Sequence, residues 1–340
     1  MREPVFWWRK AGLRAGLLSP LAAIYGAVAA RRMARAGARA GVPVLCVGNF
    51  TLGGSGKTPT AMLLAGLLAG MGERVFCLSR GYGGSHAGPK LLAAGDRADQ
   101  VGDEPLMLAR VAPTVIARDR VAGARLAREH GASAIVMDDG LQNAALAKDF
   151  TLALVDGRRG IGNGRVFPAG PLRAPLAAQL ARSDALLVVG EDSGAADVIA
   201  AAQLVNLPLL HGQLVPDAAA VAALTGRQVL AFAGIADPEK FFATAKAAGI
   251  AVAQRKGFPD HHRFTVEEVA ALIMQADENG LALLTTEKDR ARMIGDPITE
   301  SLAAQAHVLP VTMQVREVEE LRRLVAAALN RRRGLASPLP

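Results

Sequence analysis

The chain has few cysteines and few aromatic residues. Its 340 residues include two cysteines, Cys46 and Cys77, and each lies in an apolar run typical of a buried strand. We therefore expect buried, reduced thiols, as in cytosolic proteins, instead of a disulfide framework. The cysteines and histidines show no spacing typical of a metal site. Since only 4% of the residues are aromatic and none interleave with a basic patch, nucleic acid is not an expected partner.

A long apolar run is also missing. Within residues 17–30 the uninterrupted apolar stretch is shorter than the roughly 20 residues that a spanning helix needs. Trp7 and Trp8 precede this stretch, and several arginines, beginning with Arg31, follow it. The pattern is typical of a helix that lies in the membrane interface, where its basic flanks meet anionic lipids. The alternative is a helix that packs on the protein's own core.

Apolar residues and positive charges are abundant. Hydrophobic residues make up 51% of the chain, which is enough to bury large cores, and the length allows two domains of ordinary size. The formal net charge is +8. Such a surplus suits an anionic substrate or a membrane surface, and no stable protein partner is expected.

From residue 41 onward, short apolar runs alternate with helical patterns, which predicts a parallel sheet with right-handed crossovers. Residues 213–227 look like a connector, and a second α/β pattern follows them. We therefore expect an N-terminal helical segment, a large lobe, a small lobe and a tail, comprising residues 1–40, 41–225, 226–330 and 331–340. The strands expected in the large lobe are 44–47, 75–78, 114–116, 134–137, 151–155 and 185–189.

The sequence T-L-G-G-S-G-K-T at residues 51–58 joins a predicted strand to a predicted helix, which is the layout of a phosphate-binding P-loop. Its glycines let the backbone fold around a polyphosphate, and the helix N-terminus presents free N–H groups to it. Lys57 can reach the β- and γ-phosphates, and the Thr58 hydroxyl can bind Mg2+. Thr51 stands where the strict pattern has glycine. The residues expected to hold ATP are Thr51, Leu52, Gly53, Gly54, Ser55, Gly56, Lys57 and Thr58.

Two acidic motifs follow the P-loop. Asp138 and Asp139 come directly after a predicted buried strand, where P-loop enzymes carry the acidic residue that binds Mg2+ or orders water. An aspartate at a strand end can also be an ordinary turn residue. Asp103 lies in G-D-E-P before a predicted helix, and on the pattern alone helix capping explains it better than function.

Three further motifs contain candidate functional residues. Arg80 in S-R-G-Y-G-G follows the second predicted strand, and Arg173 ends the rigid loop F-P-A-G-P-L-R. Either arginine could bind phosphate, or could be an ordinary surface residue. His261 in F-P-D-H-H-R-F stands beside an aspartate, which suits acid–base chemistry or a solvated loop. The sequence T-E-K-D at residues 286–289 lacks the spacing of the guanine-reading motif, which disfavours a GTPase.

The chain resembles the tetraacyldisaccharide 4'-kinase family of the lipid A pathway, from its N-terminal segment to about residue 325. The resemblance rests on the ordered set V-G-N-F-T-L-G-G-S-G-K-T-P, S-R-G-Y-G-G, G-D-E-P, D-D-G-L-Q, F-P-A-G-P-L-R, F-P-D-H-H-R-F and T-E-K-D. It implies ATP- and Mg2+-dependent phosphorylation of a lipid A disaccharide precursor, a tetraacyl glucosamine disaccharide 1-phosphate, at its 4'-hydroxyl to give lipid IVA. It further implies an α/β fold with a P-loop NTPase-like parallel-sheet lobe, a smaller α/β lobe and a membrane-associated N-terminal helix. The enzyme would work at the cytoplasmic face of the inner membrane.

The resemblance also implies roles for particular residues. Asp103 would be the catalytic base, and His261 would assist it. Lys57 would stabilise the charge of the transition state, while Asp138 and Asp139 would serve the Mg2+ region. The two lobes would have to close to bring His261 towards Asp103.

Two positions depart from the family pattern. Asn143 stands where the family usually has histidine after D-D-G-L-Q, and Ala174 replaces the glutamate of L-R-E-P. The roles that those side chains have in the family therefore cannot transfer to this chain.

Two other functions share parts of the pattern. A P-loop regulatory ATPase or metallochaperone GTPase would share the glycine loop, but it needs neither the tryptophans at the N-terminus nor a second lobe. A membrane-binding module with a vestigial P-loop would be expected to lack Lys57 or Asp138, and both are present.

Overall fold

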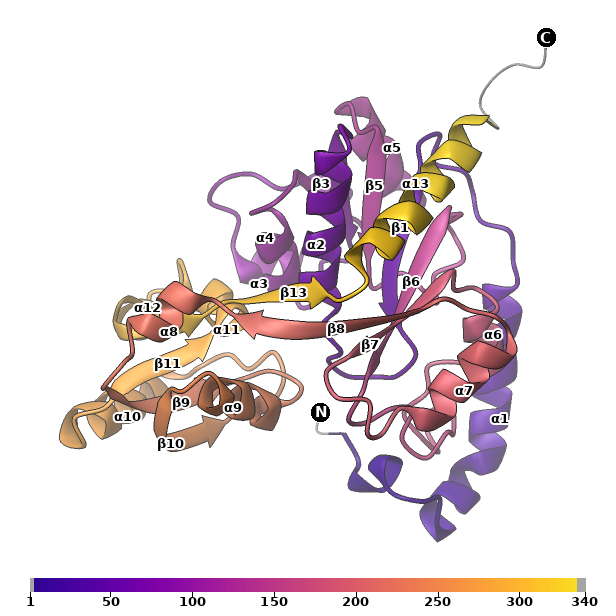
Figure 1. Ribbon diagram of the computed structural model, residues 1–340. Coiled ribbons are helices and arrows are strands. Elements are labelled where there is room, and N and C mark those ends of the chain that lie inside the picture. The colour runs from indigo at the N-terminus through magenta and orange to yellow at the C-terminus, as the bar shows by residue number, and fades with distance from the viewer. Residues whose placement is uncertain (1–2, 335–340) are drawn as a thin grey trace.

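The computed structural model describes residues 3–334, which form two α/β lobes and an N-terminal helix (Figure 1). The strands of the larger sheet are β1 (Val44–Asn49), β2 (Val75–Ser79), β3 (Lys90–Leu91), β4 (Thr114–Ile116), β5 (Ala134–Asp138), β6 (Phe150–Asp156), β7 (Ala185–Val189), β8 (Leu209–Pro216) and β13 (Val311–Val315). The strands of the smaller sheet are β9 (Gln228–Ala233), β10 (Ala251–Gly257), β11 (Ala282–Thr286) and β12 (His307–Leu309).

The strand order confirms the α/β class predicted from the sequence. Within residues 3–334 the larger sheet has nine strands in the order β13-β8-β7-β6-β1-β5-β2-β4-β3, and the smaller sheet has four in the order β10-β9-β11-β12. Neighbouring strands are parallel except for β3 with β4 and β13 with β8. Parallel strands joined by helices give a doubly covered sheet, as the alternating sequence pattern predicts.

Helices cover both faces of each sheet. One face of the larger sheet packs against α2 (Lys57–Gly70), α4 (Asp103–Leu108) and α13 (Val318–Gly334), and the other against α5 (Arg120–Glu129), α6 (Leu176–Leu180) and α7 (Ala196–Leu204). The smaller sheet lies between α8 (Ala218–Ala222) with α9 (Pro238–Ala247) and α10 (Val266–Glu278) with α11 (Glu287–Met293) and α12 (Glu300–Gln305). The other helices are η1 (Val5–Trp8), α1 (Leu13–Met33) and α3 (Ala98–Val101).

The six strands expected in the large lobe are all present, because the central strands are buried on both faces. Successive side chains of β1 alternate between the two cores: Leu45 packs with α2, and Cys46 packs with α5. Such strands are continuous apolar runs and are recognisable in a sequence. Cys46 and Cys77 are both buried free thiols, as expected.

The predicted division of the chain is wrong at its C-terminal part. Strand β8 begins before the expected connector 213–227 and continues into it, and β13 pairs with β8 in the larger sheet. Helix α13 packs on α2, so the chain returns to the large lobe before residue 330. Both strands have alternating or partial burial, which leaves no apolar run to recognise. Helix α13 includes residues 331–334 of the predicted tail, and residues 335–340 lie outside the described part of the chain.

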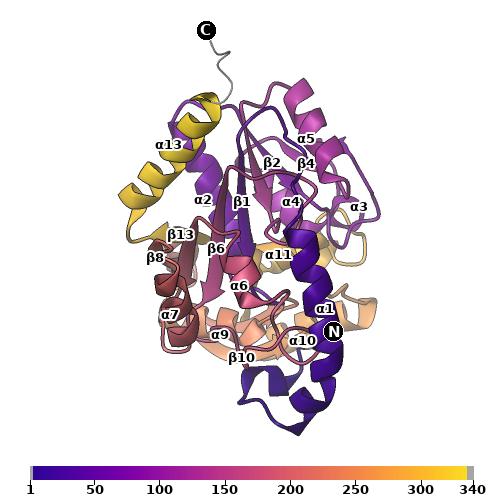
Figure 2. The same ribbon diagram turned by 90° about the vertical axis from the view of Figure 1, so that its right-hand side faces the viewer.

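Helix α1 lies along the outside of the large lobe beside α6 (Figure 2). The ring of Tyr25, near its middle, contacts Phe167 with ring centres 5.4 Å apart, whereas Leu13 and Leu17 are 89% and 81% exposed. The helix has 21 residues and an apolar window of mean hydropathy 1.4, which is long and apolar enough to cross a membrane. The helix is longer than the uninterrupted apolar run of the sequence, because it continues through residues that interrupt that run.

Candidate active site

The P-loop connects β1 to α2 at the carboxyl edge of the larger sheet. Gly53 and Gly56 have φ angles of 105° and 84°, which favour glycine over other residues. The Lys57 ammonium donates to the carbonyl of Gly53 at 3.4 Å and lies 4.0 Å from Asp139. Burial lowers the pKa of Lys57, while the charge of Asp139 opposes the shift. The lysine therefore reaches back over the loop, where the phosphates of a nucleotide would lie.

Asp138 ends β5 beside the start of α2. Its Oδ2 accepts a hydrogen bond from the Thr58 hydroxyl at 3.3 Å, whereas its buried Oδ1 and the hydroxyl of Ser55 have no partner within residues 3–334. Burial, followed by the charges of Glu104 and Asp139, raises the pKa of Asp138 to about 7. A cation at the unpartnered oxygen would favour the ionised carboxylate. The donor set of Asp138 and Thr58 therefore fits Mg2+.

The small number of protein ligands is also consistent with Mg2+. No group of three or more His, Cys, Asp or Glu residues that could hold a metal is found in residues 3–334. A magnesium ion that accompanies a nucleotide needs only one or two carboxylates, because phosphates and water supply its other ligands. The expected site needs no more than the residues present.

Asp139 is engaged by cations of the protein. One nitrogen of the Arg173 guanidinium donates to both of its oxygens, at 3.0 and 3.1 Å. Another nitrogen of Arg173 donates to the carbonyl of Thr51 at 2.9 Å. Burial acts to raise the pKa of Asp139, but Lys57 and Arg173 outweigh it and the pKa is lowered. Arg173, expected as a substrate phosphate ligand, thus links the P-loop to Asp139.

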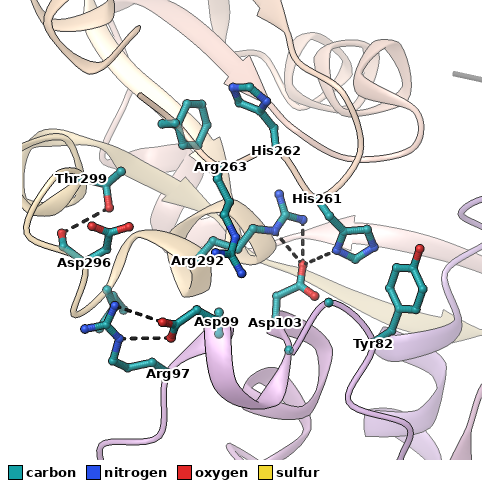
Figure 3. A pocket seen from close by; sticks show the side chains of 15 residues that line it. Tyr82, Arg97, Asp99, Asp103, His261, His262, Arg263, Arg292, Asp296 and Thr299 are labelled. Carbon is teal, nitrogen blue, oxygen red and sulfur yellow. Dashed lines mark hydrogen bonds and ion pairs between the residues drawn. The ribbon is translucent and has the colours of Figure 1, made fainter. Parts of the chain in front are cut away.

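The structure brings Asp103 and His261 together from different lobes. Asp103 is the first residue of α4 and is buried, and His261 lies in the loop after β10. The His261 Nδ1 is 3.5 Å from Asp103 Oδ2 (Figure 3). Burial opposes ionisation of Asp103, but the contacts with His261 and Arg292 hold the pKa of the carboxyl well below its usual range. The hydrogen bond to Asp103 in turn raises the pKa of His261.

His261 is held in an uncommon backbone conformation. Its φ is 55°, in the left-handed region that is uncommon for residues other than glycine. Its backbone N–H donates to the carbonyl of Gly234 at 3.1 Å. The ring of Tyr82 lies beside it, with ring centres 5.0 Å apart. Such strain is held by the surrounding structure and is common at functional sites.

Two arginines near the ends of neighbouring strands differ in burial: Arg80 is exposed and Arg120 is buried. Arg80, the other arginine expected to bind phosphate, is exposed after β2. Arg120, which sequence reasoning did not single out, is buried at the start of α5, and its Nε has no partner in the described residues. Burial lowers the pKa of Arg120, whereas Asp138 and Asp139 act to raise it. The charge of Arg120 therefore acts on Asp138 and Asp139 at the end of β5. In the sequence, only its position shortly after a strand could have marked Arg120 as a functional residue.

Two cations of the small lobe were also missed. Arg292 on α11 donates to Asp103 Oδ2 from Nε at 2.9 Å and from Nη2 at 2.7 Å. Lys288 on the same helix lies 2.7 Å from Glu104 Oε1. In the sequence, T-E-K-D disfavours a GTPase and contributes to the family resemblance, but it assigns no task to Lys288 or Arg292. No local pattern links residue 292 to residue 103, although Arg292 follows Asp289 by one helical turn.

Two hollows adjoin these residues. A groove of about 610 Å3 runs between α1 and the P-loop. Its lining combines apolar side chains with cations and comprises Leu21, Ile24, Tyr25, Val28, Ala29, Arg32, Leu52, Gln142 and Arg173. A smaller pocket of about 90 Å3 lies beside Asp103 and His261 and also contains Tyr82, Arg263 and Arg292 (Figure 3).

The two departures from the expected family pattern are local. The Asn143 side chain accepts a hydrogen bond from the backbone of Ala145 at 3.0 Å. Ala174 is fully buried in the core beneath α6 and α7. Neither side chain contacts Asp103 or Asp138 in the described structure.

Comparison with known proteins agrees with this geometry. A family model described as Tetraacyldisaccharide-1-P 4'-kinase matches residues 14–330. The tetraacyldisaccharide 4'-kinases of Rhodopseudomonas palustris (strain BisB5) and Nitrobacter winogradskyi are 52% and 54% identical, over 98% and 91% of both chains. A crystal structure of LpxK from Aquifex aeolicus in complex with ATP superposes with a TM-score of 0.71 and 27% identity, covering 94% of this chain and 100% of the other. The chain therefore belongs to the tetraacyldisaccharide-1-P 4'-kinase family, whose reaction is the ATP-dependent 4'-phosphorylation of a tetraacyldisaccharide 1-phosphate to form lipid IVA.

Proposed function

We propose that the reaction takes place between the two lobes, with ATP on the P-loop and the 4'-hydroxyl of the lipid at Asp103. The observation that carries this proposal is the pairing of Asp103 with His261 across the lobe boundary at 3.5 Å. Asp103 begins α4, which contacts α2, the helix that follows the P-loop, and the charge of Lys57 acts on the adjacent Glu104.

The side chains then have distinct tasks. Asp103 accepts the proton of the 4'-hydroxyl as the sugar oxygen bonds to the γ-phosphorus, the bond from that phosphorus to the bridging oxygen breaks, and ADP leaves. His261 orients the carboxylate of Asp103 and shares its charge. Lys57 stabilises the negative charge that is carried by the transferred phosphoryl group, and the buried Arg120 is placed to do the same.

Asp138 and Thr58 would hold a magnesium ion through the unpartnered Oδ1 of the carboxylate and through the hydroxyl. When bound, the ion neutralises charge on the β- and γ-phosphates. Asp139 keeps Arg173 and Lys57 in place beside it. This division follows from the hydrogen bonds, since Asp139 is paired with Arg173, whereas Asp138 Oδ1 has no partner among residues 3–334.

Helix α1 would place the enzyme on the inner-membrane surface, at its cytoplasmic face, in a peripheral or monotopic manner. Leu13 and Leu17 are exposed at its N-terminal end, and Arg31 and Arg32 lie in its last turn. Apolar side chains of this kind enter the acyl region while arginines meet lipid phosphates. The groove between α1 and the P-loop is suited to acyl chains, because Leu21 and Ile24 line it together with the cation Arg173.

The test measures transfer of labelled phosphate from ATP to a tetraacyl disaccharide 1-phosphate in detergent with Mg2+. The wild type should phosphorylate the lipid, and Asp103→Asn should lower kcat by about 10²–10⁴-fold, the usual contribution of a general base. ATP affinity should not change. Asp99→Asn is the matched control, because this aspartate lines the same pocket and, within residues 3–334, its carboxylate pairs with Arg97 and not with Asp103 or His261. A folded Asp103→Asn enzyme that retains wild-type kcat would contradict the proposal.

A further inference from the structure

We propose that Arg292 is a positioning residue for the catalytic base, held in place by Asp289 of the T-E-K-D segment. The inference rests on the proposed role of Asp103 as that base. It assigns a task to the T-E-K-D segment that neither the P-loop nor the Asp103–His261 pair explains.

The contact between Arg292 and Asp103 is buried and forked. The side chains are 9% and 2% exposed. Nε and Nη2 of Arg292 both donate to Oδ2 of Asp103, at 2.9 and 2.7 Å (Figure 3). A planar guanidinium can direct two donors at one carboxylate, whereas a lysine ammonium is a single point of charge. The orientation of the Asp103 carboxylate is therefore defined by a residue of the other lobe.

Arg292 is itself fixed by Asp289. Its third nitrogen, Nη1, donates to Asp289 Oδ1 at 2.9 Å and to the carbonyl of Gly234 at 2.7 Å. Asp289 has no exposed surface and also accepts hydrogen bonds from the Gly234 N–H at 3.0 Å and the Thr286 hydroxyl at 2.6 Å. Both oxygens of the Asp289 carboxylate thus accept hydrogen bonds, Oδ1 from Gly234 and Arg292 and Oδ2 from Thr286. Thr286, the N-cap of α11, Asp289 and Arg292 follow one another at intervals of three residues, which allows neighbouring side chains to meet.

Gly234 connects the arginine to the histidine. Its carbonyl accepts from Arg292 Nη1 at 2.7 Å and from the backbone N–H of His261 at 3.1 Å. Arg292 and His261 therefore approach Asp103 from a common support in the small lobe. With Oδ2 occupied by both partners, Oδ1 is the oxygen presented to a substrate hydroxyl, and within the described residues its hydrogen-bond donor is the Glu104 N–H at 3.0 Å.

The same helix pair carries two more ion pairs between the lobes. Lys288 of α11 contacts Glu104 of α4 at 2.7 Å, and Glu287 of α11 pairs with Arg110 just beyond α4. These contacts dock α11 on α4, and only the contact of Arg292 reaches the base itself. When α11 of the small lobe docks on α4, Arg292 therefore also orients the Asp103 carboxylate.

The experiment compares Arg292→Gln and Arg292→Lys with Arg290→Gln in the lipid phosphorylation assay. Arg290 is a matched control on the same helix, since its side chain contacts the carbonyl of Ala306 at 3.5 Å and not Asp103. We expect Arg292→Gln to lower kcat by about 10²-fold, within the range contributed by a general base, with the KM for ATP unchanged. Arg292→Lys should restore part of the loss, and Arg290→Gln should behave as the wild type.

A second measurement separates positioning from a purely structural role. In an Asp103→Asn background, adding Arg292→Gln should change kcat by less than about 3-fold, because both changes remove the same function. Full additivity, or wild-type kcat in Arg292→Gln, would overturn the inference while leaving Asp103 as the base. Wild-type kcat in Asp103→Asn would overturn the base assignment and the inference together. Should Arg292→Gln not fold, Arg292→Lys keeps the charge and decides the question by the same comparison.

Discussion

Arg173 donates to both carboxylate oxygens of Asp139, at 3.0 and 3.1 Å, while the adjacent Asp138 keeps one buried oxygen without a partner in the described residues. Two neighbouring aspartates at the end of one strand therefore have different surroundings. Asp139 is balanced by cations of the protein, whereas burial and neighbouring acids raise the pKa of Asp138 to about 7. The positive φ of Asp139, 50°, turns its side chain away from the direction that β5 would give it.

Replacing the two aspartates should have separable effects. Asp138→Asn should raise the Mg2+ concentration needed for half-maximal activity, because the amide is a weaker ligand for a hard cation. Asp139→Asn should instead lower the free energy of unfolding by about 1–3 kcal/mol, since Arg173 loses a charged partner. Magnesium titrations of activity and denaturant unfolding of both variants measure this. Identical Mg2+ dependence in the two variants would contradict the separation.

The pair of His261 and Asp103 predicts a pH dependence of stability. Its hydrogen bond to Asp103 raises the pKa of His261 above the value of the unfolded chain. A proton is therefore bound more tightly in the folded state, so the stabilisation is fully present below the unfolded pKa of about 6.5 and is lost as the pH rises through the folded pKa. The difference in unfolding free energy between the wild type and His261→Gln should shrink from pH ~6 to pH ~9. If the difference in unfolding free energy grew with pH, this would contradict the raised pKa of His261.

Membrane attachment should depend on the exposed end of α1. Leu13→Glu with Leu17→Glu should weaken sedimentation with vesicles that contain anionic lipid, because the apolar face is replaced by charge. These side chains are 89% and 81% exposed, so the fold should tolerate the change. Leu204→Glu is the matched control, since Leu204 is 86% exposed on α7. Equal vesicle binding by the double variant and the control would favour a helix that serves only the protein's own packing.

The two thiols should be inert in the folded enzyme. Burial raises the pKa of Cys46 and Cys77 to about 12, so almost no thiolate is present at neutral pH. A disulfide reagent should label neither residue in native protein and both in urea. Rapid stoichiometric labelling under native conditions, with activity retained, would contradict their burial.

Local features of the site could be predicted from the sequence, and contacts between distant segments could not. The P-loop and Asp138 are recognisable because a strand, a loop and a helix follow one another within a few residues. The pairing of Asp103 with His261 came from the family resemblance, since the spacing of two residues so far apart carries no geometric information. The family assignment also removes the regulatory ATPase and metallochaperone GTPase alternatives.

Other parts could not be predicted because their sequence signals are weak or shared. Strand β13 has alternating burial at the edge of the sheet, so it lacks the continuous apolar run that marked the central strands. Arg292 is one charged residue on a helix with several, and only the fold places it against Asp103. Arg173 is predicted from the sequence as a phosphate ligand, and in the structure its hydrogen-bond partners are Asp139 and Thr51.

The return of the chain to the larger sheet has a consequence for synthesis on the ribosome. Strand β13 closes the edge beside β8, and α13 covers the apolar surface of α2, yet both come from the last described residues of the chain. The large lobe, although it begins first, cannot be completed until the entire small lobe has been translated. During that interval the edge of β8 and one side of α2 stay uncovered, which makes the nascent chain dependent on prompt completion of its C-terminus.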